Sequence, residues 1–522
     1  MSEAAAPAGK ERIEPRLLIG FLAMVVGMFM AILDIQIVAA SLSEIQAGLA
    51  ASADEIVWVQ NAYLISEVIM IPLSGYVSRA LGMRWTFVIS AGGFTVASLA
   101  CAFAQNMGQM IVLRVIQGFI GGAMIPTVFA AAYTVMPRSR MASTTVMIGL
   151  VATLAPTIGP TLGGWLTESF SWHWLFLVNV VPGLAVTAIV WAFIDVDKPQ
   201  LDLIRTVDVL GLVLMAAFLG CLDFVLEDGS RNDWFADEAI RTCAVIAVVA
   251  GIGFFWRTLT SKNPIVDLRA FSDRNFATGC AFSFILGIAL YGLVYVQPQF
   301  LGRVRGLNSM QIGAVMIVTG ASQFLSAPIV GSISRKVDPR ILLCMGFSCL
   351  AASNFMLADL TADWDFDEFF APQVLRGIGY MFTIIPANVL ALGTLPPERM
   401  KNASGLYNLM RNLGGAFGLA GISTVIDQRF ALHWARIGEA VAPSRPEVQS
   451  MLSTLTERYA AIPGMSSSAA AAKTLGQIVY RQATVMTFMD VFWLMAWVSS
   501  AAIVVVLLAR KPRQAPAAGG GH

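Results

Sequence analysis

Few ionisable side chains lie inside the long apolar runs of this sequence, and these few define the chemistry it can perform. Asp34 lies about two-thirds of the way along the first run, Glu67 in the middle of the second and Arg114 about one turn inside the fourth. A charged side chain in hydrocarbon is unfavourable unless it is paired or hydrated. The three residues are therefore candidates for a function that uses charge within a membrane.

Both acids are suited to carry a proton. A low-dielectric environment favours a neutral carboxyl group, whereas a nearby cation favours the carboxylate, so a group under both influences can change protonation when its surroundings change. The sequence does not distinguish Asp34 from Glu67 as the proton carrier, and a structural hydrogen bond is the alternative role for each. Asp223 and Asp490 lie nearer the ends of apolar runs, where solvated or structural carboxylates are expected.

Arg114 is expected to provide a fixed positive charge. Arginine keeps its proton in proteins, so this side chain can tune a carboxylate or bind an anionic group. Gln117 lies three residues further on and shares its helix face. Because Arg114 is near the end of its run, extension of the side chain to the membrane surface is the alternative.

Other polar side chains within the runs predict a substrate cavity. The expected cavity residues are Gln36, Tyr63, Gln117, Asn408 and Arg411. Met24, Met28, Met30, Met70 and Met124 lie on runs expected to line it. Flexible, polarisable methionines suit an apolar site that accepts many ligands, and packing against lipid is their alternative role.

The fifth run combines prolines with small residues: Pro156, Gly159, Pro160, Gly163 and Gly164. Missing backbone hydrogen bonds permit bending, and small residues let helices approach closely. A gating hinge and ordinary helix packing are both compatible with this pattern.

The sequence contains none of the patterns expected of an enzyme. No catalytic triad, metal-spaced His/Cys cluster or GxxxxGK[ST] phosphate loop is present. The three histidines are scattered, and the six cysteines lie in apolar stretches, where they are expected to be free thiols. We therefore expect no cofactor, no metal and no direct use of ATP.

Composition indicates a membrane protein. Of 522 residues, 57% are hydrophobic and 13% charged, whereas a soluble domain is about a quarter charged. Apolar runs of eighteen or more residues are long enough to cross a bilayer. A net charge of +1 suggests no nucleic-acid partner, and polar residues 1–15 lack the features of a cleaved signal peptide. The expected fold class is an all-α polytopic membrane protein.

The apolar runs predict fourteen transmembrane helices. Their expected ranges are 17–41, 56–77, 85–104, 110–136, 144–167, 174–194, 209–226, 242–260, 276–300, 309–333, 341–360, 369–395, 404–426 and 483–509. The one long connection, 427–482, is polar and rich in Ala and Ser. It is expected to be either a mobile loop or a docking element.

The distribution of Lys and Arg predicts the topology. Basic residues occupy alternate connections and both tails, as in Arg79 with Arg84, Arg138 with Arg140, Lys262 with Arg269, and Arg335 with Lys336. The connections 42–55, 105–109 and 361–368 contain none. Because cytoplasmic loops carry the excess of positive charge, both termini are expected in the cytoplasm.

Two of the basic connections form an internal repeat. Gly75–Arg84 (GYVSRALGMR) resembles Gly331–Arg340 (GSISRKVDPR) at an offset of 256 residues. Halves repeated in the same orientation are typical of transporters whose substrate site lies between two helix bundles. The offset leaves 209–226 and 242–260 as two additional helices between the bundles.

These motifs carry a resemblance to a known family. The Gly75–Arg84 connection, with Gly82, resembles the loop motif of the major facilitator superfamily, and APTIGPTLGG at 155–164 resembles its antiporter motif. The segments WVQNAYL at 58–64, WHWLFLVNVVPG at 172–183 and SGLYNLMRNLGG at 404–415 are similar to the fourteen-span drug:proton antiporters of EmrB/QacA type. The resemblance extends over about residues 17–509.

Two positions depart from the family pattern. The first run keeps Asp34 but changes neighbouring Thr, Asn and Pro positions of the family signature. Arg79 stands where the superfamily usually has Asp, so the usual capping of the next helix by that charge is in doubt.

The resemblance implies a major facilitator fold. The expected parts are a tail at 1–16, six-helix bundles at 17–194 and 276–509, two inserted helices within 195–275, and a tail at 510–522. Asp34, Glu67 and Arg114 would couple transport to protons, with Arg114 near the first-span acid. Gly75, Gly82 and Arg84, together with the prolines and glycines of the fifth apolar run, would act as gate or hinge residues.

The predicted function is export of amphipathic compounds in exchange for protons, from a bacterial inner membrane. Export of one metabolite, siderophore or lipid is the alternative within transport, and a membrane-embedded enzyme or sensor is the alternative from another class. The resemblance also implies a periplasmic adaptor and an outer-membrane channel as partners.

Overall fold

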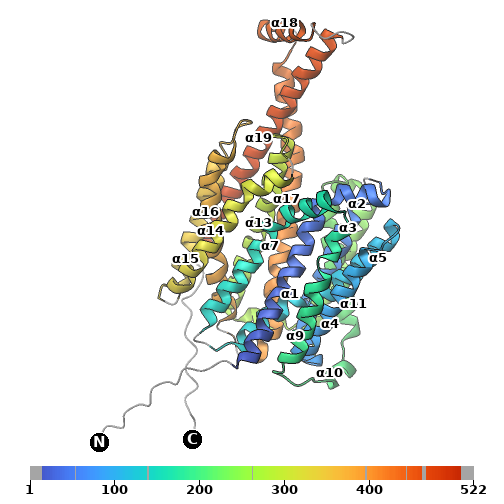
Figure 1. The fold of residues 1–522 in the computed structure, drawn as a ribbon. Coiled ribbons are helices and arrows are strands. Elements are labelled where there is room, and N and C mark those ends of the chain that lie inside the picture. The colour runs from blue at the N-terminus through green and yellow to red at the C-terminus, as the bar shows by residue number, and fades with distance from the viewer. Residues whose placement is uncertain are drawn as a thin grey trace, which may run out of the picture.

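The computed structural model describes residues 14–506 apart from positions 53, 138–139, 262, 308, 335, 394, 396, 443 and 461–465. Several basic residues of the topology prediction lie outside the described residues: Lys10, Arg12, Arg138, Lys262, Arg335, Arg510, Lys511 and Arg513. The predicted tails lie almost wholly outside them too. All regular elements in the described part of the chain are helices (Figure 1).

The first part of the chain contains α1 to α9, and a short helix follows them. Their bounds are α1 Pro15–Ala40, α2 Leu42–Leu49, α3 Trp58–Leu81, α4 Met83–Cys101, α5 Met107–Gly121, α6 Met124–Val135, α7 Met141–Ser169, α8 Trp174–Leu177, α9 Val180–Phe193 and α10 Asp202–Arg205. The predicted fourth span is α5 with α6, and the sixth is α8 with α9.

Two inserted helices precede the second bundle. They are α11 Val209–Asp228 and α12 Glu238–Thr260, joined through the short helix η2 Trp234–Ala236, and η3 Leu268–Ser272 follows. The remaining helices are α13 Arg274–Arg303, α14 Ser309–Ile333, α15 Pro339–Leu357, α16 Phe366–Leu392, α17 Pro397–Ala440, α18 Pro446–Ala460 and α19 Ser467–Val506.

The number of spans agrees with the prediction except at one helix. Among the described residues, thirteen helices are long and apolar enough to cross a membrane, counting α5 with α6 and α8 with α9 as single spans. The predicted segment 85–104 is α4, whose 19 residues include Arg84 and several Ser, Thr and Gly, and α4 packs against α5 and α9. A fourteenth span at α4 stays a prediction.

The internal repeat is visible in the packing of the helices. In the first bundle α1 packs against α7, α3 against α5, and α4 against α9. In the second bundle α13 packs against α17, α14 against α16, and α15 against α19. The bundles meet where α3 contacts α17 and where α7 contacts α14, and α11 lies against both α3 and α17. This arrangement has the two repeated helix bundles that the sequence predicted.

Small residues hold α7 close to α1. Pro156 and Pro160 lie inside a continuous helix. A Cβ added to Gly163 would lie 2.7 Å from the backbone oxygen of Ile37, and one added to Gly159 would collide with the side chain of Gln36. Both glycines therefore serve close helix packing, and a gating hinge in α7 stays a prediction.

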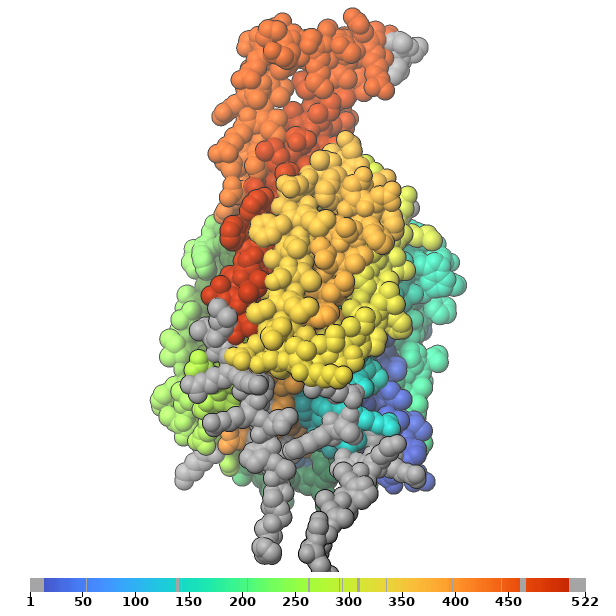
Figure 2. All heavy atoms as spheres, turned by 90° about the vertical axis from the view of Figure 1, so that its left-hand side faces the viewer, coloured from blue at the N-terminus to red at the C-terminus, as the bar shows by residue number. Residues whose placement is uncertain are grey.

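The segment 427–482 differs from the expected loop. Its described residues include the end of α17, all of α18 and the start of α19, which together form a projection beyond the rest of the molecule (Figures 1 and 2). No residue of α18 is buried. The polar, Ala-rich composition that suggested a loop is equally compatible with solvated helices, because Ala, Glu and Arg favour helix formation.

The contact between α1 and α7 gives a stability prediction. Gly163→Ala places a methyl group against backbone, and such overpacking costs about 1–3 kcal/mol, which outweighs the gain in helix propensity of about 1 kcal/mol. Gly421→Ala is the matched control, because nothing lies within 4 Å of its added Cβ. We expect a lower apparent melting temperature in detergent for Gly163→Ala only. Equal temperatures for the two variants would contradict the packing role.

Candidate functional site: a buried ion pair beside two cavities

A buried ion pair lies in the middle of the first bundle. Arg114 Nη1 on α5 donates to Asp34 Oδ2 on α1 at 2.7 Å, and both side chains are 0% exposed. Two amides complete the shell: Asn179 Nδ2 donates to Asp34 Oδ1 at 2.8 Å and Gln117 Nε2 donates to the same oxygen at 3.3 Å. The carboxylate is thus held by three donors and neutralised by one cation.

Arg114 is fixed in place by further contacts. Its Nε donates to the carbonyl oxygen of Val59 at 2.8 Å, and its Nη1 also donates to Gln117 Oε1 at 2.7 Å. The guanidinium lies 4.3 Å from the ring centre of Tyr63. The alternative that Arg114 extends to the membrane surface is therefore wrong. Tyr63 and Gln117, expected to line the substrate cavity, belong to this ionic network.

Asn179 is a member of the network that sequence reasoning did not identify. It lies at the break between α8 and α9, and Ser98 Oγ accepts a hydrogen bond of 3.2 Å from its side chain. A polar residue directly before the start of an apolar helix was the available signal. Residue spacing could not show that it meets Asp34, because the two are 145 positions apart.

Glu67 is also buried, but none of the donors that surround Asp34 forms a hydrogen bond with it. Its side chain is 1% exposed, and Oε1 has no hydrogen-bond partner in the described part of the chain. It lines a cavity of about 50 Å³ together with Asp223 and Glu227 of α11 and Asn412 of α17. The two acids that the sequence left equivalent are therefore different: Asp34 is paired, whereas Glu67 faces a cavity.

A larger cavity adjoins this one between the two bundles. We call the first the inner cavity and the second the vestibule, and Gln60, Glu227 and Leu419 line both. The vestibule has a volume of about 560 Å³ and is bounded by α1, α2, α3, α11, α13 and α17. Its lining includes Tyr295 and Gln299. The vestibule lies at the end of the molecule where α11 ends, opposite the Gly82 connection.

The remaining predicted cavity residues lie elsewhere. Gln36 packs against α7, and Arg411 donates to Asn408 and lies 5.4 Å from the ring centre of Phe129. None of the five predicted cavity residues lines the inner cavity or the vestibule. On α17 the face that lines them carries Asn412, Gly415, Ala416 and Leu419. These positions have helical spacing and lie on a different face of α17 from Asn408 and Arg411, whose substrate role stays a prediction.

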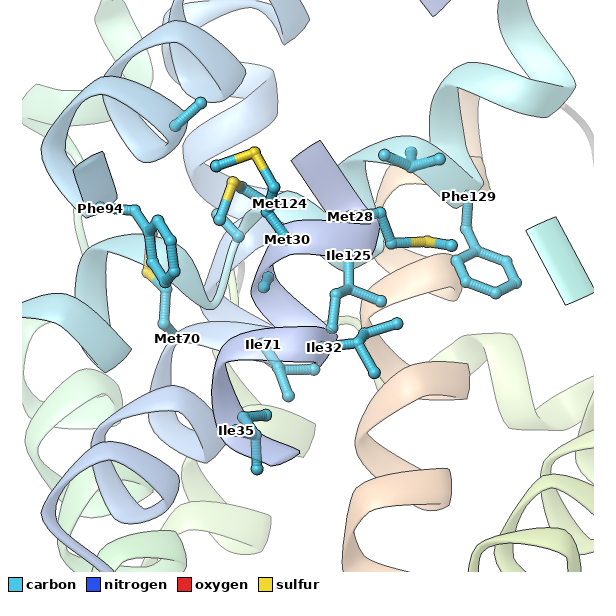
Figure 3. Close-up of a cluster of buried hydrophobic side chains, with 14 of the residues drawn as sticks. Met28, Met30, Ile32, Ile35, Met70, Ile71, Phe94, Met124, Ile125 and Phe129 are labelled. Carbon is cyan, nitrogen blue, oxygen red and sulfur yellow. The ribbon is translucent and has the colours of Figure 1, made fainter. Parts of the chain in front are cut away.

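The methionines form part of the core of the first bundle. Met24, Met28, Met30, Met70 and Met124 are all at most 8% exposed. Figure 3 shows Met70 beside Phe94 and Met28 beside Phe129, on either side of α1. The alternative that they face lipid is therefore wrong, and none of them lines the inner cavity or the vestibule.

A contact joins the bundles at the opposite end. Lys401 at the start of α17 forms an ion pair with Asp197 and donates to the backbone oxygen of Ser78 at 3.0 Å. A Cβ added to Gly75 would lie 2.8 Å from the Lys401 backbone oxygen, so the approach of α3 to α17 requires a glycine there. We call this contact the Asp197 latch.

Asp197 also provides the helix cap that the loop motif usually obtains from an Asp at the position of Arg79. Its Oδ1 accepts the backbone N–H of Met83 at 2.9 Å, which caps the start of α4. Gly82, at φ +82°, makes the tight turn before that helix, and Arg84 pairs with Asp195 at 3.5 Å. In this chain the linker after α9 supplies the acid that the loop motif lacks.

The described residues contain no metal centre. No group of three or more His, Cys, Asp or Glu is placed there to hold a metal ion. The six cysteines form no disulfide. The chemistry available at this site is proton binding and charge pairing.

Comparisons with known proteins place this geometry in a family. A profile of the Major Facilitator Superfamily matches residues 24–419. The colistin resistance protein EmrB of Acinetobacter baumannii is 42% identical over 476 residues, which cover 91% of this chain and 93% of that protein. The multidrug export protein EmrB of Escherichia coli K12 is 29% identical, with coverage of 97% and 98%.

A solved structure has the same fold. The crystal structure of the human organic anion transporter MFSD10 matches with a TM-score of 0.58 at 13% identity, covering 93% of this chain and all of that one.

The ion pair gives a double-mutant prediction. Arg114→Gln leaves Asp34 buried without its cation, and breaking a buried pair in this way costs about 3–5 kcal/mol. The double variant Asp34→Asn/Arg114→Gln removes both charges and should recover most of that loss. Thermal denaturation of the wild type, both single variants and the double variant in detergent measures the coupling. A double variant less stable than either single one would contradict the pairing.

Proposed function

The chain belongs to the Major Facilitator Superfamily, and on that basis we propose that it is a proton-coupled multidrug efflux transporter of a bacterial inner membrane. The names of the two EmrB proteins support drug efflux. The observation that carries proton exchange is the contrast between the paired Asp34 and the unpaired Glu67 beside a cavity. A vestibule of about 560 Å³ falls within the usual range of about 300–1,000 Å³ for small-molecule sites.

Glu67 is the proton carrier in this proposal, and the Asp34–Arg114 pair is the fixed charge beside it. Asp34 is held in its pair with Arg114 and by the amides of Asn179 and Gln117, so a change in its charge would break contacts within the first bundle. No residue in the described part of the chain forms such a pair with Glu67. Its protonation removes a buried charge from the contact between α3 and α17 and thereby favours one arrangement of the bundles over the other.

The two ends of the molecule have the roles that alternating access requires. The Asp197 latch holds the bundles together at the end carrying Arg84 and Lys401, and the vestibule reaches exposed Arg231, Arg303 and Asp427 at the other. The distribution of basic residues supports a cytoplasmic location for the latch and for both termini. On this orientation the vestibule faces the outer side, and a second cavity of about 460 Å³ lies between the start of α7 and the end of α14 on the latch side.

The projection formed by α17, α18 and α19 supports the proposed partners. On the outer side it would stand in the periplasm, and it exposes Trp434, Ile478, Tyr480 and Met451. Phe430 and Trp434 stack at 6.1 Å and Tyr480 contacts both rings, which gives the projection a defined aromatic surface. We propose that it binds a periplasmic adaptor that continues to an outer-membrane channel.

The assignment of Glu67 predicts how two variants differ. Glu67→Gln should reduce uptake of an amphipathic cationic dye, driven by a pH gradient into inside-out vesicles, to background. Its melting temperature should not change, because the replaced oxygen Oε1 has no hydrogen bond to lose. Asp34→Asn should lower both transport and melting temperature, because it breaks the pair with Arg114. Gradient-driven uptake by Glu67→Gln at the wild-type rate would rule out this carrier.

The adaptor proposal predicts a separable loss. Replacing residues 441–466 with a short Gly/Ser linker removes α18 and should abolish copurification with a coexpressed adaptor from the same genome. Dye transport in vesicles should persist, since both cavities lie outside this segment. Undiminished copurification would place the adaptor interface elsewhere.

A further inference from the structure

The inserted helix α11 brings two acids to the contact between the bundles. We infer that Asp223 and Glu227 form a proton pathway from the vestibule to Glu67, so that the inserted helix has a part in energy coupling. The inference rests on the proposed proton exchange and extends it, because it states how the proton reaches its carrier. α11 packs against α3 and α17, the two helices that contact each other across the bundles.

The acids are arranged in order of depth. Asp223 and Glu227 are four residues apart on α11, so their side chains lie on one face of the helix about one turn apart. Both line the inner cavity with Glu67, and Glu227 also lines the vestibule. The series Glu227, Asp223, Glu67 therefore connects the open vestibule to the buried carboxyl group without leaving the two cavities.

The two deeper acids have unsatisfied oxygens. Asp223 is 3% exposed and Glu67 1% exposed, and neither Asp223 Oδ2 nor Glu67 Oε1 has a hydrogen-bond partner within the described residues. Neither Asp223 nor Glu227 forms an ion pair with another described residue. A buried polar atom without a partner is costly, so these carboxyl groups are not placed there for stability.

The charged groups around the pathway leave it predominantly acidic. Arg114, Asp34 and Arg411 lie near Glu67, and Asp228 lies near Glu227. Arg114 is already paired with Asp34, and Arg411 donates to Asn408. Arg231 at the rim of the vestibule pairs with Asp54 at 2.5 Å.

The size of the inner cavity identifies what moves through it. Its volume of about 50 Å³ holds water but is far below the several hundred Å³ that drug-sized ligands occupy. The vestibule is about tenfold larger. Substrate and proton therefore use connected but different spaces, and the acids of α11 serve the smaller one.

The transfer is balanced in protons and charge. The Glu227 carboxylate takes a proton from a hydronium ion in the vestibule, which leaves as water, and passes it to Asp223, directly or through water in the inner cavity. Asp223 passes it to Glu67, and each donor returns to the carboxylate form. Glu67 holds the proton until the arrangement of the bundles changes and then gives it to water on the other side, so one proton crosses in each cycle and every carboxyl group returns to its starting form.

Asp223→Asn, Glu227→Gln and their double variant test the pathway in vesicles with two readouts. Proton-transfer groups typically contribute about 10²–10⁴-fold to rates, so we expect dye transport driven by a pH gradient to fall at least about tenfold. Exchange of labelled for unlabelled dye at equal pH on both sides involves no net proton movement and should stay within about twofold of wild type. Asp223→Glu should retain gradient-driven transport. Glu238→Gln, an exposed acid in the first turn of α12, is the matched control.

The outcomes separate this inference from the proposed function. If the wild type is driven by the gradient and the double variant transports equally fast, the pathway is wrong although proton exchange stands. If gradient-driven transport and dye exchange fall together, the acids support structure or bind substrate, and the pathway is again wrong. If the wild type itself ignores the gradient, the proposed exchange fails and the pathway fails with it.

Discussion

The burial of one full positive charge in the first bundle is the constraint on which the rest of the site depends. Arg114 is 0% exposed, and a cation at that depth requires a carboxylate and further hydrogen-bond acceptors. Asp34 supplies the charge, and Val59 and Gln117 supply the acceptors. This requirement fixes how α1, α3 and α5 pack together. It also ties Asp34 to Arg114, whereas Glu67 lines the inner cavity with an oxygen that has no hydrogen-bond partner among the described residues.

The second bundle repeats the helices but not the charge pair. Arg376 on α16 is also buried, yet its hydrogen bonds go to Thr319 and Gln373 and not to a carboxylate. Acidic groups gather instead where α11 meets α3 and α17, so the chemistry of the site is asymmetric within a symmetric fold. Helix α11 thus adds two acids to the one that α3 brings to the contact between the bundles.

Hydropathy predicted the helical membrane fold and the depth of Asp34, Glu67 and Arg114, and the likeness of two connections predicted the repeat, because each can be recognised in short segments of the chain. What could not be predicted depends on distances between remote residues. The sequence left Asp34 and Glu67 equivalent, because their difference arises from contacts with Asn179 and α11 made across the bundle. It left 427–482 as either a mobile loop or a docking element and did not predict its helices, because polarity alone does not separate a solvated helix from a coil.

The most direct test of the account is the proton released when substrate binds to purified protein in weakly buffered detergent solution. A substrate exchanged for a proton must displace one from the outer-accessible carrier, so the wild type should acidify the solution when the dye is added. Glu67→Gln should bind the dye and release no proton. Proton release from Glu67→Gln equal to that of the wild type would contradict the central claim that this carboxyl group carries the proton.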